Sequence, residues 1–165
     1  MGNRFVPLSV PNLKGNELKY VSEAIEAEWV STGGAFIEEL EKKIAEYVGA
    51  PGAVACQSGT SGIHLALLSR GISSGDEVIV PTLTFVAAVN PVIYCGAEPV
   101  FMDCDDSLCM DMEKVEKFCD EECSFNDGVL IDKTTGKRVK ALIVVHVFGN
   151  MACVIFLICN KYIIK

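Results

Sequence analysis

Residues 57–68 combine glycines, hydroxyl side chains and an apolar run in a pattern that could bind a phosphate group. Two glycines and three hydroxyl residues, Ser58-Gly59-Thr60-Ser61-Gly62, precede an apolar run that continues to Leu68. A short apolar run at 53–56 leads into them and predicts a buried strand. A strand–turn–helix connection exposes unpaired backbone N–H groups at a helix N-terminus, which carries about half a positive charge. The stretch therefore predicts a cradle for the phosphate of a cofactor, although a plain capped helix start has the same composition.

Alternating helical and extended patterns surround this stretch. Two helices are predicted first, over 17–29 and 35–48, with Gly49 ending the second. The later segments predict a strand at 77–81, a helix from Phe85 to Tyr94 kinked by Pro91, a strand at 99–103, a helix capped by Asp111 that ends near Phe118, a surface hairpin over 129–139 and a long buried strand at 141–150. This order predicts an α/β fold with a largely parallel sheet flanked by helices.

The composition favours a folded, acidic protein. Of the 165 residues, 50% are hydrophobic and 22% are charged, which argues against a disordered chain. The length suits one domain with a sizeable core. The net charge of −8 and the lack of any Lys/Arg cluster argue against nucleic acid or an anionic membrane surface as a partner.

Eight cysteines lack the paired spacing of a zinc site, and only His64 and His146 could join them as ligands. We therefore expect no metal site, and free thiols in a reducing cytoplasm. The N-terminus shows no signal peptide. The apolar run at 141–159 is interrupted by His146, Gly149 and Asn150, so we expect no membrane span.

Several short motifs occur together in a fixed order. They are Trp29-Val30-Ser31-Thr32-Gly33, Ser58-Gly59-Thr60-Ser61-Gly62, Gly75-Asp76-Glu77-Val78-Ile79-Val80-Pro81, Thr84-Phe85, Gly96-Ala97-Glu98-Pro99-Val100-Phe101 and Val145-His146-Val147-Phe148-Gly149. In this order they resemble the nucleotide-sugar aminotransferases of the DegT/StrS family, which are fold-type I enzymes dependent on pyridoxal 5′-phosphate (PLP). The hairpin and Asn90-Pro91 look most similar to the branch that aminates a UDP-linked 4-keto-6-deoxy sugar toward legionaminic acid.

The resemblance implies a role for each matching position. Gly59, Thr60 and Ser61 would hold the PLP phosphate, and Phe85 would stack on the pyridine ring, where a plain core aromatic is the alternative. Asn90 would face the same cavity. His146 would end a buried strand, where open α/β sheets place ligands; a satisfied core histidine is its alternative. The loop containing Ser31, Thr32 and Gly33 is a candidate for touching the sugar substrate, and His64 is expected to be structural.

The resemblance also defines what this sequence lacks. In the family, a Schiff-base lysine and an aspartate that pairs with the pyridinium nitrogen lie downstream of the Val-His-x-Phe-Gly strand. Here the matching motifs run from about residue 6 to Asn150, and residues 151–165 form an apolar tail without them. We therefore expect residues 1–150 to be the N-terminal part of the large domain, with helices at 16–48 and a sheet region at 53–150. We also expect an inactive, truncated copy without catalytic residues.

Two other functions remain open from the sequence. The chain could be a non-catalytic pseudoenzyme or a dimerisation partner of a full-length relative, since the full-length enzymes of this kind are expected to be homodimers with glutamate as amino donor. It could also be a small Rossmann-like nucleotide binder, although the turn lacks G-x-G-x-x-G spacing and no Walker lysine follows.

Overall fold

The computed structural model describes residues 5–7, 9–31 and 33–153. The chain divides into a first unit, residues 1–55, and a second unit, residues 56–165. The predicted features at Thr32 and over 154–165 lie outside the described residues.

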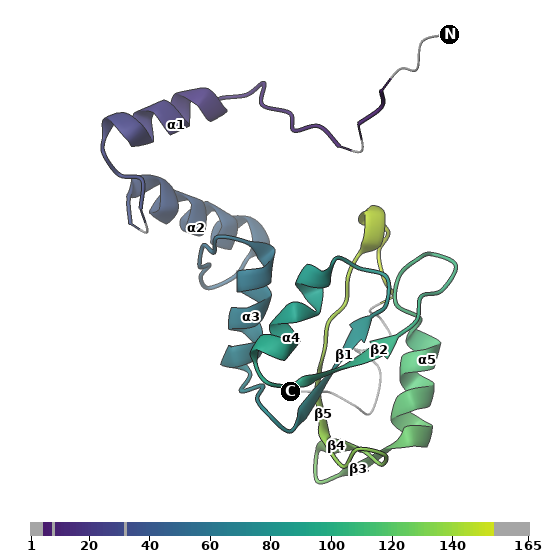
Figure 1. Ribbon diagram of the computed structural model, residues 1–165. Coiled ribbons are helices and arrows are strands. Elements are labelled where there is room, and N and C mark those ends of the chain that lie inside the picture. Colours follow the sequence, from purple (N-terminus) through teal and green to yellow (C-terminus); the bar gives the residue numbers. More distant parts are fainter. Residues whose placement is uncertain (1–4, 8, 32, 154–165) are drawn as a thin grey trace. The chain divides into compact units, whose positions relative to one another are not determined.

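The first unit contains two amphipathic helices, α1 (Glu17–Glu26) and α2 (Ala35–Val48), labelled in Figure 1. The helix α2 ends as predicted, at Gly49, which adopts the left-handed conformation with φ of 69°. The helix α1 stops three residues before the predicted Trp29, because Glu28 turns the chain with φ of 58°. Neither helix has a buried residue, so the apolar stripe of each stays exposed.

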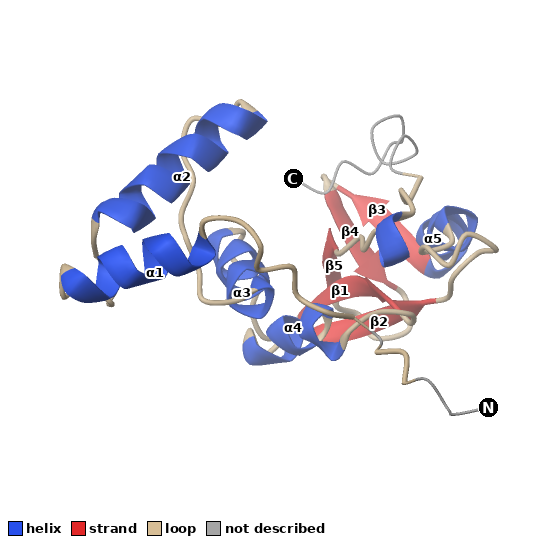
Figure 2. Cartoon of the chain, turned by 90° about the horizontal axis from the view of Figure 1, so that it is seen from above, coloured by secondary structure: helices blue, strands red, loops and turns tan. Residues whose placement is uncertain are grey.

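A five-stranded sheet forms the centre of the second unit, with strand order β2-β1-β5-β4-β3. The strand bounds are β1 (Asp76–Pro81), β2 (Glu98–Met102), β3 (Cys123–Asn126), β4 (Val129–Asp132) and β5 (Arg138–Leu142). Both neighbours of β1 run parallel to it, whereas β3, β4 and β5 pair antiparallel. Helices α3 (Gly59–Ser69) and α4 (Asn90–Tyr94) lie on one face of this sheet and α5 (Met112–Lys117) on the other, as Figure 2 shows. This confirms the predicted α/β class with helices flanking a sheet.

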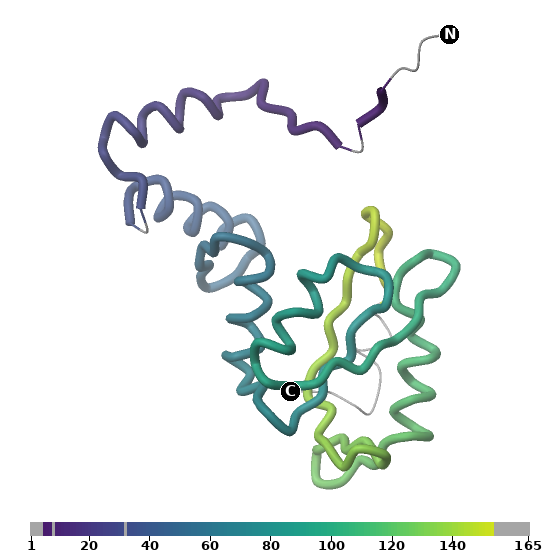
Figure 3. The backbone as a smooth tube through the Cα atoms, viewed as in Figure 1, coloured from purple at the N-terminus to yellow at the C-terminus, as the bar shows by residue number. Residues whose placement is uncertain are grey.

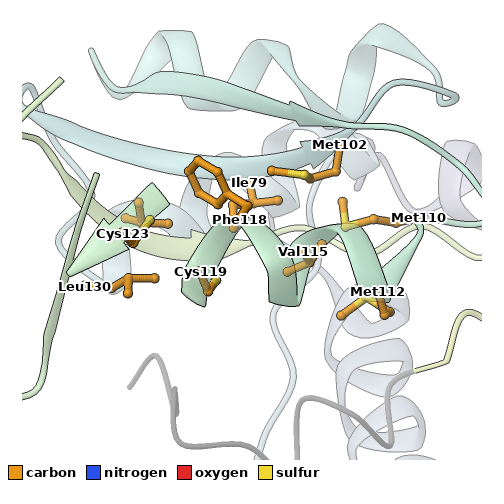
Figure 4. Packing of buried hydrophobic residues seen from close by; sticks show 10 residues of the cluster. Ile79, Met102, Met110, Met112, Val115, Phe118, Cys119, Cys123 and Leu130 are labelled. Carbon is orange, nitrogen blue, oxygen red and sulfur yellow. The ribbon is translucent and has the colours of Figure 1, made fainter. Parts of the chain in front are cut away.

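The alternation of side chains along β1 divides the core into two layers. Ile79, fully buried, packs with residues of α5 in the cluster drawn in Figure 4. Val78 and Val80, which are also fully buried, point to the other face and pack against Leu67 of α3 and Val92 of α4. The apolar run over residues 78–81 of β1 is buried on both faces, as is typical of parallel strands, and two buried carboxylates, Asp76 and Glu77, precede it.

Three helix predictions have different outcomes. Asp111 caps α5 as predicted: its Oδ1 accepts the N–H groups of Glu113 at 3.0 Å and Lys114 at 3.2 Å. The predicted helix over 85–94 is wrong as one element, since it divides into a 3₁₀ turn, Val86–Ala88, and α4. Pro91 lies in the first turn of α4, where its missing N–H costs nothing, so it helps to start a helix instead of kinking one.

Two strand predictions are wrong. Residues 53–56 form no strand, and the Val54 side chain is 74% exposed, so a short apolar run does not by itself make a buried strand. The long strand predicted over 141–150 ends at Leu142. One further bond, from Ile143 N–H to the Ile79 carbonyl at 2.9 Å, follows the ladder, and then the partner strand β1 stops at Pro81.

The predicted hairpin is present and larger than expected. Strands β4 and β5 pair antiparallel, with Ile131 opposite Arg138, and Asp132 closes the turn by accepting Thr134 N–H at 2.6 Å. A further strand, β3, pairs with β4 across Asp127-Gly128, whose φ values are 51° and 80°. An Asp-Gly pair is a strong hairpin signal, so the sequence contained the information for this extra strand.

Candidate functional site

The first part of the site is the N-terminus of α3. Ser58, in extended conformation, caps this helix: its Oγ accepts the N–H of Ser61 at 3.2 Å, and its carbonyl accepts Gly62 N–H at 3.1 Å. The N–H groups of Gly59 and Thr60 occupy the first two helical positions, which have no intrahelical carbonyl to bind. The helix therefore presents two backbone donors, and the hydroxyls of Ser58 and Ser61 lie 3.1 Å apart beside them.

This terminus fits an anion in space as well as in charge. No acidic residue lies in the first turn of α3, so nothing there neutralises the positive end of the helix dipole. A Cβ added at Gly59 or Gly62 would meet no atom within 4 Å, which means that the approach to the backbone is open. The three predicted residues are not equivalent, however. Gly59 and Thr60 can offer their amides to a ligand, whereas the Ser61 amide already donates to the cap, so Ser61 can offer only its hydroxyl.

The second part of the site is a cavity of about 350 Å³ lined by Leu83, Thr84, Phe85, Val145, His146, Val147 and Phe148. These residues follow the parallel strands β1 and β5, so the cavity lies at the carboxyl end of the sheet. Figure 1 shows these two strands side by side. Open α/β sheets bind ligands at this edge. The structure thus brings together two predicted residues, Phe85 and His146, that are far apart in the sequence.

Phe85 is 88% exposed, so the alternative interpretation as a core aromatic is wrong. Phe148, which the sequence analysis gave no role, is 84% exposed and lines the same cavity. His146 is exposed too, which excludes the alternative of a core histidine; its Nδ1 accepts the N–H of Ala152 at 3.1 Å. Two exposed phenyl rings beside one cavity provide an apolar surface that a flat ligand could cover.

The remaining predicted residues lie elsewhere. Asn90 is half-buried at the start of α4 and, among the described residues, is not part of the cavity lining. Ser31 and Gly33 are exposed in the loop between α1 and α2 of the first unit, and Thr32 lies outside the described residues. His64 packs edge-on against the Tyr94 ring at 5.6 Å, which agrees with its expected structural role.

The carboxyl end of β2 carries a carboxylate that the sequence analysis missed. Asp103 accepts the backbone N–H of Cys104 at 2.9 Å and the Lys114 ammonium at 3.2 Å, and both interactions hold the pKa of this carboxyl below its usual range. The Thr82 hydroxyl, which follows β1, donates to it at 3.4 Å. Asp103 therefore ties the ends of β1 and β2 to α5 at the edge where the cavity lies. A polar residue at the end of a predicted strand was the available signal.

Other chemistry is limited in the part of the chain that the structure describes. It contains no group of three or more side chains that could hold a metal ion, and none of its helices has the length and apolarity needed to cross a bilayer. Burial raises the pKa of the Cys119 thiol to about 11 and that of Cys123 to about 12. Both thiols therefore stay protonated at neutral pH and are poor nucleophiles.

A capped helix N-terminus with two available amides, and an aromatic-lined cavity after the carboxyl ends of β1 and β5, are features of the class of cofactor-binding α/β proteins. The profile of the DegT/DnrJ/EryC1/StrS aminotransferase family matches residues 11–161. The chain belongs to this family, as its motifs predicted.

Individual relatives support the assignment. The GDP-perosamine synthase of Caulobacter vibrioides is 40% identical over 147 residues, which cover 88% of this chain and 35% of that protein. A DegT/DnrJ/EryC1/StrS aminotransferase from Brucella abortus superposes with a TM-score of 0.72 at 34% identity, over 87% of this chain and 36% of the other. The PLP-form of the putative sugar aminotransferase Spr1654 from Streptococcus pneumoniae gives a TM-score of 0.76 at 26% identity, over 93% of this chain and 35% of the other. The chain thus spans about 35% of the length of the relatives that it matches.

Proposed function

We propose that this chain forms the cofactor-phosphate cradle of a PLP-dependent nucleotide-sugar aminotransferase. The observation that carries the proposal is the N-terminus of α3, where Ser58 caps the helix and leaves the amides of Gly59 and Thr60 available. Family membership supports PLP as the group whose phosphate binds there. The cap matters because it satisfies Ser61 N–H internally, which fixes the direction in which the two remaining amides point.

The residues of the candidate site have separate roles in this proposal. The amides of Gly59 and Thr60, with the Ser61 hydroxyl, bind the phosphate. Phe85 provides one flat apolar face for the pyridine ring, and covering a phenyl group that is 88% exposed adds hydrophobic stabilisation to that contact. Asn90, at the start of α4, is proposed to hold the loop after Phe85 in place.

When bound, PLP supplies an electron sink that lets an amino group move between donor and acceptor, with glutamate as the proposed donor. The proton shuttle for this chemistry needs a lysine, and none lines the cavity among the residues that the structure describes. We therefore propose that the 165-residue chain by itself binds the cofactor phosphate without catalysing transfer, since loss of such a group removes several orders of magnitude in rate.

The substrate class follows from the relatives' names and stays a proposal. GDP-perosamine synthase and the UDP-4-amino-4-deoxy-L-arabinose–oxoglutarate aminotransferase of Shewanella sediminis, which is 37% identical, both carry nucleotide-linked amino sugars in their names. We propose a nucleotide-linked 4-keto-6-deoxy sugar, with Ser31 and Gly33 as candidate contacts. The finer prediction, a UDP-linked sugar of the legionaminic-acid type, is supported only by the hairpin over 129–139 and Asn90-Pro91.

The test uses a cofactor analogue that cannot react with surface lysines. Pyridoxine 5′-phosphate and pyridoxine differ only in the phosphate, and calorimetry with the 165-residue chain should show binding of the first and at least tenfold weaker binding of the second. Equal affinities would contradict the cradle. A second measurement adds PLP, glutamate and UDP- or GDP-linked 4-keto-6-deoxy sugar; an amino-sugar product in mass spectrometry would overturn the proposed inactivity and identify the nucleotide.

A second candidate function, association with a second copy or a full-length relative, is supported by the exposed apolar faces of α1 and α2. Between these helices lies a groove of about 460 Å³ lined by Tyr20, Val21, Ala24, Phe36, Glu39, Leu40 and Lys43. Leu40→Glu should then shift sedimentation toward the monomer, whereas Lys42→Glu on the exposed polar side should not. A chain that is monomeric at all concentrations, and that does not co-purify with an intact homologue, would exclude this candidate.

A further inference from the structure

The turn over residues 146–152 is closed by a hydrogen bond to the side chain of its first residue, His146. The Ala152 N–H donates to Nδ1 of His146 at 3.1 Å, and two backbone bonds, Gly149 N–H to the His146 carbonyl at 3.2 Å and Asn150 N–H to the Val147 carbonyl at 3.0 Å, shape the chain between them. Ala152 is only 2% exposed, so its amide has little access to water and needs this acceptor. The imidazole is thus part of the backbone hydrogen bonding of the turn.

A second set of bonds fixes the turn against a neighbouring loop. The Asn150 side chain donates to the Ser107 carbonyl at 2.9 Å, and the Cys109 thiol donates to the Asn150 carbonyl at 3.4 Å. Cys109 is 1% exposed, so its thiol is shielded from water that would compete for this bond. Figure 3 shows the two segments meeting, the turn in yellow-green beside the green loop that precedes α5.

The turn also holds one residue in an unfavourable conformation. Phe148 has φ of 54° and ψ of 21°, in the left-handed region that residues with a Cβ rarely adopt. This conformation is disfavoured because it brings Cβ close to the following carbonyl oxygen. It persists because the bonds at His146 and Asn150 hold the chain on both sides, and its result is a phenyl group exposed on the cavity that Phe85 and His146 also line.

The bond to Nδ1 decides which ring nitrogen carries the proton. A backbone amide can only donate, so Nδ1 must offer a lone pair, and in neutral imidazole the single proton then lies on Nε2. A proton on Nδ1 would face the Ala152 N–H and break the bond that closes the turn. Since Nδ1 is occupied, the polar group that remains for a ligand in the cavity is Nε2–H, a donor.

We infer that the 146–152 turn is a positioning device that holds His146 as the Nε2–H tautomer, so that the histidine offers a hydrogen bond to an acceptor oxygen of a cavity ligand and no lone pair for taking up a proton. The inference deepens the proposed function, because it gives His146 the role of an orienting donor beside the Phe85 ring face. The inference can be tested without a bound ligand, because the hydrogen bond from Ala152 sets the tautomer in the free chain.

The experiment is long-range ¹H–¹⁵N correlation NMR on the ¹⁵N-labelled 165-residue chain at pH 8, where an ordinary imidazole is neutral. The chain has two histidines, so a His64→Gln variant assigns the signals, and in wild type His64 is the internal comparison. We expect Nδ1 of His146 at the shift of an unprotonated nitrogen, Nε2 at that of a protonated one, and a scalar coupling across the hydrogen bond between Ala152 N and His146 Nδ1. A protonated Nδ1, or two averaged nitrogen shifts without the coupling, would overturn the inference.

Two variants separate positioning from general stability. Ala152→Gly keeps the N–H and should preserve the tautomer, whereas Ala152→Pro removes it and should give averaged His146 shifts while the β1 and β5 amide signals remain. If Ala152→Pro unfolds the chain, the wild-type coupling still decides. Failure of pyridoxine 5′-phosphate to bind would contradict the proposed function. It would not affect this inference, because the NMR spectra of the ligand-free chain decide the tautomer.

Discussion

Replacing Ser58 by aspartate should separate the stability of α3 from its ability to bind phosphate. Aspartate is as good an N-cap as serine, so its carboxylate can accept the Ser61 N–H that Ser58 Oγ accepts at 3.2 Å. Its negative charge at the positive end of the helix should add about 0.3–1 kcal/mol to the free energy of unfolding. The same charge would lie beside any bound phosphate and repel it.

The repulsion can be sized from Coulomb's law. Two unit charges about 4 Å apart in a water-like surrounding interact by about 1 kcal/mol, and a phosphate monoester carries about 1.5–2 charges at pH 7. Ser58→Asp should therefore weaken pyridoxine 5′-phosphate binding by about 1.5–2 kcal/mol, roughly ten- to thirtyfold, and leave pyridoxine binding unchanged. The assays are calorimetric titration and thermal unfolding of the same samples.

Matched variants isolate the two effects. Ser58→Asn keeps a neutral cap and should resemble wild type in both assays. Ser58→Ala loses the cap, which should cost about 1 kcal/mol, or roughly 2–4 °C in Tm for a chain of this size, without adding any charge. Wild-type affinity of Ser58→Asp for pyridoxine 5′-phosphate would refute the reasoning, because an anion held at this terminus cannot ignore a carboxylate next to it.

Three further predictions concern buried charge and backbone strain. Glu77 is 2% exposed and burial raises its pKa, so the folded state loses stability as the pH rises from about 4.5 through that raised pKa. Glu77→Gln should abolish this decline in the free energy of unfolding, measured by urea unfolding at pH 5 and pH 8. If the variant keeps the decline, Glu77 is not its source. Asp76, fully buried, forms ion pairs with Arg138 Nη2 at 2.6 Å and with Lys140 Nζ at 3.5 Å. Asp76→Asn should therefore lower the free energy of unfolding by about 1.5–3 kcal/mol, less than for a fully buried pair because water screens both cations; an unchanged urea midpoint would contradict this. Phe148→Gly should raise Tm, since it relieves about 1 kcal/mol of left-handed strain at an exposed side chain, and a lower Tm would show that the phenyl group packs more than its exposure indicates.

The sequence predicted best the elements whose signals are local. Three such elements are the cap of α5 at Asp111, the end of α2 at Gly49 and the buried strand β1. Each is predicted by residues that lie close together in the sequence. The failures concern elements whose length depends on a distant partner. Residues 53–56 are as apolar as a strand but do not form one, and β5 stops at Leu142 because β1, some sixty residues earlier, ends in a proline.

The candidate site shows the same division. The capped N-terminus of α3 could be predicted, since a cap and its helix are contiguous, and its use as a phosphate cradle stays a prediction. The meeting of Phe85 with His146 required the parallel pairing of β1 and β5, and the resemblance to the family supplied what periodicity could not. The left-handed Phe148 had no signal of its own, because only the bonds at His146 and Asn150 impose that conformation.

The pairing of β1 with β5 also affects how the chain folds during its synthesis. A ribosome releases β1, β2 and the helix α5 well before residues 138–142. One edge of β1, all of whose residues are buried in the folded sheet, is therefore unpaired during the synthesis of about sixty residues. Non-local parallel pairs form late because the intervening chain must first be ordered. The hairpin of β3 and β4 folds locally just before β5 emerges and delivers it beside β1, which shortens the wait during which the nascent chain could aggregate.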